Sequence, residues 1–192
     1  MKNHVSKIVS ACFYHIRRLC QIRHYVSREV LKQLVTSLVL FRLDYCNSVL
    51  VGLPGSTLMP LQRVQNAAAR LVLGLDRRSH TTAALQDLHW LPVKHRITFK
   101  IASLMHQVLH QRCPTYLSDI VEFNSVGIQR RLRSTTTRAA VVRRTRTQFG
   151  RRAFAVCGPD IWNALPSAIR TTDSYPAFRR SLKTHLFHIA FN

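Results

Sequence analysis

Apolar residues recur at steps of three and four along much of the first 123 residues. Near the N-terminus the pattern joins Val5, Ile8, Cys12, Ile16 and Leu19. This spacing places the side chains on one face of an α-helix, because a helix turns once every 3.6 residues. A half-buried strand would instead alternate apolar and polar residues. The pattern predicts a mainly α fold.

Capping residues and stop signals divide the pattern into a bundle of about five helices. Ser27 predicts the start of the second helix and Gly74 the end of the third, since serine caps helix N-termini and glycine caps C-termini. Pro54 and Pro114 mark further breaks. A last helix is expected from near Ser174. The second helix is expected to bury the stripe Val30, Leu31, Leu34, Val35, Leu38, Phe41, Tyr45 and Val49, and Phe13 and Tyr14 are expected in the core as well.

The amino-acid composition of the chain changes after residue 123. No acidic residue occurs between Glu122 and Asp160. We expect an irregular basic arm at 124–137, a segment at 139–156 that allows short strands, and then the C-terminal helix. The expected division is a helical, thumb-like block at 1–123 and an arginine-rich arm with a small C-terminal unit at 124–192. The arm's nine arginines are Arg130, Arg131, Arg133, Arg138, Arg143, Arg144, Arg146, Arg151 and Arg152.

The charge balance is the strongest functional signal. The chain has 29 Lys and Arg against 8 Asp and Glu, a formal net charge of +21. Such an excess opposes compaction through self-repulsion unless a polyanion compensates it. Arginine also suits bidentate contact with phosphate. We therefore expect RNA, an RNA–DNA hybrid or DNA as the partner, bound without sequence specificity because phosphates carry no base identity. The expected contacts are Arg130, Arg131, Arg133, Arg143, Arg144, Arg146, Arg151 and Arg152.

Neither a catalytic site nor a cofactor site is evident in the sequence. The 8 acidic residues form no pair at the spacing that two-metal phosphoryl transfer needs, and the 6 glycines are isolated rather than gathered in a phosphate loop. His106, His110 and Cys113 are a weak zinc candidate, since histidines four apart share a helix face. The alternative is that both histidines lie on a solvated face. We expect no enzyme activity and no cofactor.

The expected location is intracellular, in the cytoplasm or the nucleus. The five cysteines are scattered without a C-x-x-C pair, which favours free, buried thiols in a reducing compartment. The most apolar stretch, 34–53, is interrupted by Arg42 and Asp44. These charges argue against a transmembrane helix, and no membrane partner is expected.

Several strings of the sequence carry a family resemblance. The clearest are Phe41–Ser48 (F-R-L-D-Y-C-N-S), Leu61–Arg70 (L-Q-R-V-Q-N-A-A-A-R) and Leu88–Val93 (L-H-W-L-P-V) with Arg96. Together with later strings, they resemble the C-terminal part of the polyproteins of non-LTR (LINE-type) retrotransposons of the Jockey and chicken-repeat superfamily. The resemblance covers nearly the whole chain. The later strings are Pro114-x-Tyr116-Leu117, Leu132–Ser134, Arg144–Gly150, Ala153-Phe154, Trp162–Pro166 and Leu182–Phe187.

The resemblance implies the thumb and C-terminal tail of a reverse transcriptase. The palm's F/Y-x-D-D motif and the family's endonuclease are absent, and Asp44 does not correspond to a palm aspartate, so no catalytic residue transfers. The resemblance implies that this region binds the RNA template or the RNA–DNA duplex during target-primed reverse transcription. Arg63 and Arg70, on the polar side of the third helix, are candidates for this contact.

Two other hypotheses remain open. One hypothesis is that the chain is a protein-interaction module, whose helical block packs on a polymerase palm domain or self-associates. The apolar residues Val39, Leu40, Leu50 and Val51, which widen the stripe of the second helix, motivate this hypothesis. The other is a genomic remnant with no function of its own.

Overall fold

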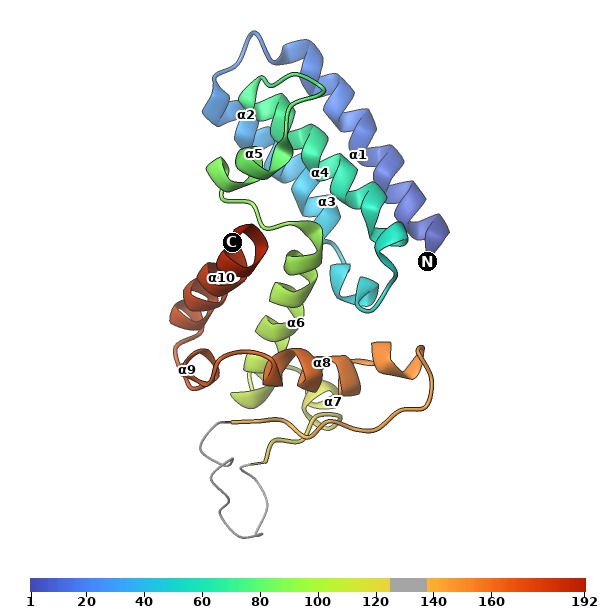
Figure 1. The fold of residues 1–192 in the computed structure, drawn as a ribbon, viewed down its shortest axis with the longest axis vertical. Coiled ribbons are helices and arrows are strands. Elements are labelled where there is room, and N and C mark those ends of the chain that lie inside the picture. Colours follow the sequence, from blue (N-terminus) through green and yellow to red (C-terminus); the bar gives the residue numbers. More distant parts are fainter. Residues whose placement is uncertain (125–137) are drawn as a thin grey trace. The chain divides into compact units, whose positions relative to one another are not determined.

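The protein is mainly α-helical, as its periodicity predicts. The computed structural model describes residues 1–124 and 138–192. Within them the regular structure is helical, and β pairing is limited to an isolated antiparallel bridge between Phe123 and Ala140. Figure 1 shows the order of the helices along the chain. No helix in this part of the chain is both long and apolar enough to span a bilayer.

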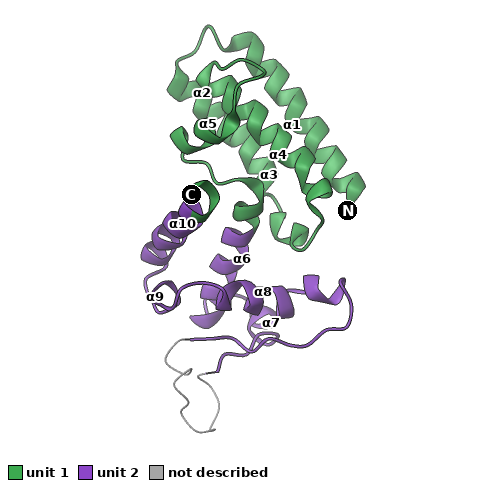
Figure 2. Ribbon diagram, viewed as in Figure 1, with its two compact units in different colours: residues 1–97, 189–192 green, residues 98–188 purple. Residues whose placement is uncertain are grey.

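The chain forms two compact units. Unit 1 comprises Met1–Ile97 and Ile189–Asn192, and unit 2 comprises Thr98–His188, as coloured in Figure 2. The boundary falls inside helix α6 (Val93–Leu109) rather than at residue 123. Residues 98–123 belong with the C-terminal part because His106 and Phe123 both contact the ring of Trp162.

Unit 1 is built on α1 (Lys2–Ile22) and α4 (Gly55–Leu73), which pack against each other. Ala68 and Ala69 of α4 are fully buried. Small side chains let two helices approach closely, which suits the packing of α4 in this unit. The remaining helices of unit 1 are α2 (Arg28–Val35), α3 (Phe41–Asp44), α5 (Thr81–Asp87) and the first turn of α6.

The helix caps expected in unit 1 are confirmed. The Ser27 hydroxyl accepts a hydrogen bond from the Val30 backbone N–H at 3.3 Å. Gly74 follows α4 at φ +65°, and the Leu75 N–H donates to the Arg70 carbonyl at 3.0 Å. A left-handed glycine with this backward bond is a Schellman motif, which satisfies carbonyls that the helix end leaves open. Local sequence signals therefore set these boundaries.

A π-helical turn at Thr36–Leu40 joins α2 to α3 and changes which residues are buried. Leu31, Val35, Val39 and Leu43 are buried at steps of four. In a regular α-helix, side chains four residues apart are about 400° apart around the axis, so each buried position would lie about 40° further round than the one before. The wider π turn offsets this shift and keeps the four side chains on one face. The expected stripe is therefore wrong in part: Val30, Phe41, Tyr45 and Val49 are exposed, while Val39, Leu40 and Leu50 are buried. Tyr14 of α1, also expected in the core, is 52% exposed and packs beside Arg18.

Unit 2 surrounds an aromatic and histidine core. Trp162 of α8 (Phe154–Asn163), Phe178 of α10 (Tyr175–Phe191) and His106 of α6 are fully buried. Their rings lie in mutual contact, with the centroids of His106 and Phe178 4.2 Å apart. The short helices α7 (Thr115–Ser118) and α9 (Ser167–Arg170) connect the longer ones. The last helix begins at Tyr175, next to the expected Ser174.

The short strands allowed for 139–156 do not form among the described residues. Phe154 and Val156 instead begin α8, preceded by a 3-10 turn at Gly150–Arg152. Val156, Pro159 and Trp162 are buried at steps of three, which is a helical spacing. Their burial against the core decides the conformation over the β preference of single residues. The expected irregular arm at 124–137 lies, apart from Asn124, outside the described residues.

Candidate nucleic-acid interface

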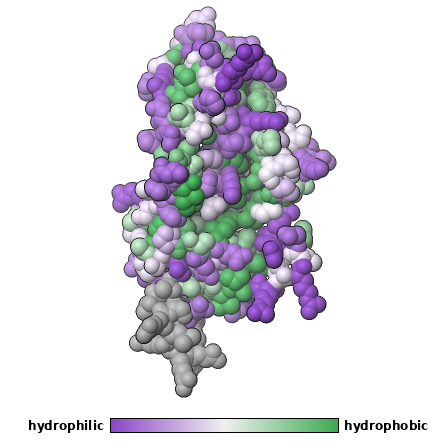
Figure 3. Space-filling model, in the orientation of Figure 1, coloured by the Kyte–Doolittle hydropathy of each residue, from purple (hydrophilic) through white to green (hydrophobic). Residues whose placement is uncertain are grey.

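Positive charge is spread over both units. Unit 1 contains 14 Lys and Arg and 4 Asp and Glu, whereas unit 2 contains 15 and 4, so the net charges are +10 and +11. The face in Figure 3 shows hydrophilic residues, in purple, interspersed with apolar ones. Among the described residues, four ion pairs join Lys or Arg to a carboxylate. The basic arm therefore accounts for only part of the charge available to a polyanion.

The structure places the arm's arginines in different settings. Arg130, Arg131 and Arg133 lie outside the described residues. Arg143 is paired with Glu122 at 3.0 Å, and both side chains are exposed. Arg152 is half-buried at the end of the 3-10 turn. Three more are exposed, and no ion pair joins them to a carboxylate in the described part of the chain: Arg144, Arg146 and Arg151. Among the described arginines of the arm, these three are the most accessible to a ligand.

The segment that carries these arginines is anchored to the core of unit 2. The Trp162 indole N–H donates to the Arg138 carbonyl at 2.7 Å. The Asn163 side chain bonds both backbone groups of Ala140, accepting from its N–H at 2.9 Å and donating to its carbonyl at 2.8 Å. The Arg138 side chain pairs with Asp173 at 2.7 Å and lowers the pKa of that carboxyl. The start of the basic segment is thus fixed in place.

The two arginines expected on α4 differ in availability. The Arg63 side chain is exposed and contacts the Met59 sulfur at 3.4 Å. Arg70 donates from Nε and from a terminal nitrogen to the Ser79 carbonyl, at 3.2 and 2.9 Å. These bonds use two of the five N–H donors of the guanidinium. Arg70 therefore holds the loop after α4, and Arg63 is the freer candidate for phosphate.

Two strings of the family resemblance meet through Asp44 and Arg96. The Arg96 Nε donates to an Asp44 oxygen at 2.8 Å, and a terminal nitrogen of Arg96 donates to the other oxygen. The buried Asn47 donates to the same carboxylate at 3.3 Å. The pair cannot be predicted from local sequence patterns, because 52 residues separate its members. A bidentate pair of this kind joins α3 to α6.

Two glutamines of the Leu61–Arg70 string form hydrogen bonds with the backbone of the Leu88–Val93 string. The Gln65 side chain, which is fully buried, donates to the Leu91 carbonyl at 2.8 Å. The Gln62 side chain accepts from the Val93 N–H at 2.9 Å and donates to Asn66. These bonds satisfy backbone groups where the chain enters α6. Gln62 and Gln65, like Asp44 and Arg96, therefore form structural contacts within unit 1.

Two aromatic side chains of the C-terminal part have opposite surroundings. Trp162 is fully buried, so its ring cannot stack on a base. Phe149 is 81% exposed and lies between Arg146 and Arg151 in the sequence. Base stacking on exposed rings is common in proteins that bind single strands. Phe149 is therefore the stronger candidate of the two.

The weak zinc candidate does not form a ligand cluster. No three His, Cys, Asp or Glu side chains are placed to hold a metal ion in residues 1–124 and 138–192. His106 is fully buried rather than solvated, and its Nε2 lies 2.8 Å from the Thr172 carbonyl, as a neutral ring that donates there would. Burial lowers the pKa of His106, and also that of His110. Of the five free cysteines, Cys12 and Cys157 are buried as expected, whereas Cys20 and Cys46 are exposed, so the expectation of buried thiols is wrong in part. Burial raises the pKa of Cys12 to about 11.

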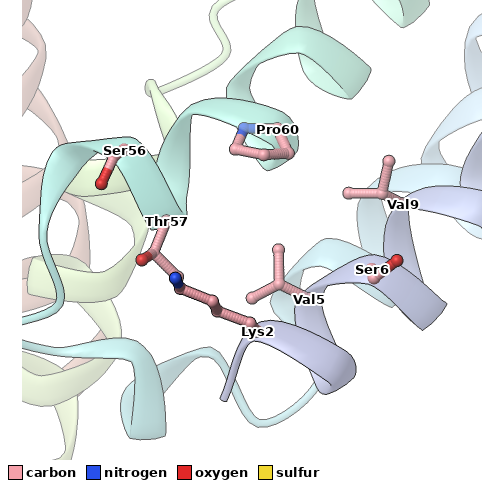
Figure 4. A pocket seen from close by; sticks show the side chains of 7 residues that line it. All are labelled: Lys2, Val5, Ser6, Val9, Ser56, Thr57 and Pro60. Atoms are coloured by element: carbon pink, nitrogen blue, oxygen red, sulfur yellow. The ribbon is translucent and has the colours of Figure 1, made fainter.

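A surface hollow of about 340 Å³ lies between the starts of α1 and α4. Figure 4 shows Lys2 extending toward Thr57 across its mouth. The other lining residues are small or apolar: Val5, Ser6, Val9, Ser56 and Pro60. A single cation gives this hollow little electrostatic attraction for a polyanion.

The comparisons with known proteins identify no relative. No family pattern, no curated protein and no solved structure matches this chain.

Proposed function

We propose that this chain is a catalytically inactive fragment of a non-LTR retrotransposon reverse transcriptase. Its function is to bind the backbone of RNA or of an RNA–DNA duplex without sequence specificity. The observation that carries the proposal is the net charge of +21. All 8 acidic residues are already subtracted in this value, so carboxylates of the chain itself cannot compensate it. Release of counterions from a polyanion would provide the driving force for binding.

The part of the basic segment that the structure describes supports this proposal. Arg144, Arg146 and Arg151 are exposed on a stretch of chain whose start is fixed by Trp162 and Asn163. A cation on an anchored backbone loses less conformational entropy on binding than one on a free chain. The resemblance to the thumb and tail suggests the duplex as the ligand, and Arg63 adds a candidate contact on α4.

The test measures fluorescence anisotropy of labelled single-stranded RNA, duplex DNA and an RNA–DNA hybrid, at low and near-physiological salt. We expect binding that weakens steeply, with log affinity falling by about 0.7–0.9 per unit of log salt for each phosphate neutralised. RNA or the hybrid should bind more tightly than duplex DNA. A salt-independent affinity would contradict the proposal.

A second candidate function, a protein-interaction module, is favoured by a specific exposed surface. Phe41 and Tyr45, four residues apart, are 70% and 65% exposed, and Val49 is 45% exposed. Exposed aromatic side chains of this kind are enriched in protein interfaces. Light scattering should then show self-association that Phe41→Ser and Tyr45→Ser abolish. A monomer at all concentrations would leave only a foreign partner, such as a polymerase palm domain.

A further inference from the structure

A second surface hollow, in unit 2, combines a confined volume with concentrated positive charge. It measures about 330 Å³ and is lined by Phe99 of α6 and by Pro176, Arg179, Arg180 and Lys183 of α10. Ligand sites have volumes of about 300–1,000 Å³, so the hollow is at the small end of that range. It differs from the hollow near Lys2 in having three cations instead of one.

Arg179 is held between two aromatic rings. Its guanidinium carbon lies 5.7 Å from the ring centroid of Phe99 and 5.6 Å from that of Tyr175. Guanidinium groups within about 6 Å of a ring centroid are attracted to the ring face. This contact orients the side chain without using its N–H groups. The donors of Arg179 therefore remain available for a ligand.

The charge around the hollow is not compensated within the described residues. Arg179, Arg180 and Lys183 are all exposed, and none of the four ion pairs includes them. Helix α10 contains no Asp or Glu. Like charges three or four residues apart on a helix repel each other, so this arrangement does not stabilise α10. An anion bound between the side chains would remove the repulsion.

We propose that this hollow binds the phosphate group of a nucleotide. The fork of Arg179 donates two parallel hydrogen bonds to phosphate oxygens, which is the geometry in which arginine binds phosphate most strongly. Arg180 and Lys183 add positive charge beside it. Where the phosphate belongs to a nucleic-acid strand, the inference rests on the proposed function. The same site would also take the phosphate of a free nucleotide.

The first experiment compares two charge-matched triple variants of the full chain. The site variant carries Arg179→Gln, Arg180→Gln and Lys183→Gln. The control carries Lys7→Gln, Arg17→Gln and Arg78→Gln, which remove the same charge from exposed positions of unit 1. For labelled single-stranded RNA, the site variant should lower the salt slope by about 0.7, because the hollow holds one phosphate group and each phosphate neutralised contributes about 0.7. The control should leave the slope unchanged. Equal losses in both variants would overturn the inference and leave the proposed function standing.

A second pair of variants tests the contact between Arg179 and the rings of Phe99 and Tyr175. Phe99→Leu keeps every charge but removes one of the two rings that hold Arg179, and we expect affinity for the RNA to fall about two- to five-fold. Arg179→Lys keeps the charge and removes the planar fork, and it should weaken binding as well. Far-UV circular dichroism checks that each variant is folded. Unchanged affinity in both variants would overturn the role of the clamped arginine.

The free nucleotide is tested separately with adenosine 5′-monophosphate, observed by phosphorus NMR. Line broadening by wild type and its loss in the site variant would assign the site to free nucleotides too, even if RNA does not bind and the proposed function fails. Binding of RNA alone, weakened only in the site variant, would assign it to strand phosphates. Absence of binding to either probe would overturn the inference.

Discussion

The two units carry nearly the same net charge but are stabilised differently. In unit 1, polar side chains join consecutive strings of the sequence: Asp44 to Arg96, and Gln62 and Gln65 to the backbone before α6. In unit 2, the rings of His106, Trp162 and Phe178 form the core. Unit 1 adds these polar bonds to a core of mostly aliphatic side chains, whereas unit 2 has fully buried rings at the centre of its core. A substitution in the core of unit 2 should consequently cost more.

Trp162→Ala should give the largest effect and directly tests this difference. The variant loses a fully buried indole and its hydrogen bond to Arg138, which should lower the free energy of unfolding by about 3–5 kcal/mol. Urea unfolding followed by circular dichroism measures the loss. As a control, Tyr116→Ala removes a ring that is 66% exposed in the same unit and should cost less than about 0.5 kcal/mol. Similar losses in both variants would remove the special role of the aromatic core.

Gly158→Ala tests how tightly α8 packs in unit 2. A Cβ at this position would lie 2.8 Å from the sulfur of Met105, which is fully buried and has little room to move. The overpacking should cost about 1–3 kcal/mol in unfolding free energy. Gly55→Ala is the matched change in unit 1, where nothing lies within 4 Å, and should be neutral or slightly stabilising. A neutral Gly158→Ala would show that this core is loosely packed.

The Asp44–Arg96 pair tests whether polar contacts stabilise unit 1. The Arg96 side chain is 18% exposed and that of Asp44 is 40% exposed, so the pair is partly screened by solvent. A double-mutant cycle with alanine should give a coupling energy of about 1–2 kcal/mol. The Arg28–Asp87 pair, at 55% and 58% exposure, is the control and should give less than about 0.5 kcal/mol. Equal coupling energies in the two cycles would show that the lower exposure of the Asp44–Arg96 pair does not strengthen it.

The smallest effect expected is a pH dependence of the folding stability that arises in unit 2. Burial lowers the pKa of His106 from its ordinary 6.5, so the unfolded chain takes up this proton at a higher pH than the folded chain. Stability should therefore be complete above about pH 6.5 and decrease as the pH falls below that value. His110, whose pKa burial also lowers, adds to the same trend, whereas the Asp173 carboxyl titrates below this range.

His106→Phe should reduce this pH dependence. The measurement compares urea midpoints at about pH 7.5 and about pH 5.5 for the variant and the wild type. The variant will be less stable overall, because it loses the contact with the Thr172 carbonyl, but its loss between the two pH values should be smaller. An identical loss in both proteins would assign the pH dependence to other groups.

The sequence predicts unit 1 better than unit 2 for a physical reason. The cap at Ser27 and the glycine after α4 act within a few residues of themselves, and local signals of that kind are visible in a sequence. The π turn at Thr36–Leu40 leaves no such signal, so the exposure of Phe41 and Tyr45 was not foreseen. Helix α8 was missed because burial of Val156 and Trp162 against distant segments determines it.

The candidate site shows the same limit. Net charge predicts a polyanion, and the arginine-rich segment predicts where part of that charge lies. It does not predict that Arg143 pairs with Glu122 or that Arg70 holds Ser79, because each partner is selected by the fold. The hollow at Arg179 depends on Phe99, 80 positions earlier in the sequence, and on Tyr175. Tyr175 lies one helical turn before Arg179, but no spacing rule connects either residue to Phe99.

The bridge between Phe123 and Ala140 has a consequence for how this protein can change over evolutionary time. The Asn124 N–H donates to the Ala139 carbonyl at 2.9 Å, so residues 124 and 139 are held side by side. The entropic cost of closing a loop between two fixed points rises by only about 0.6 kcal/mol for each doubling of loop length. Insertions and deletions between these two points should therefore be tolerated. The same place suits an engineer who wishes to add a tag or a second binding domain.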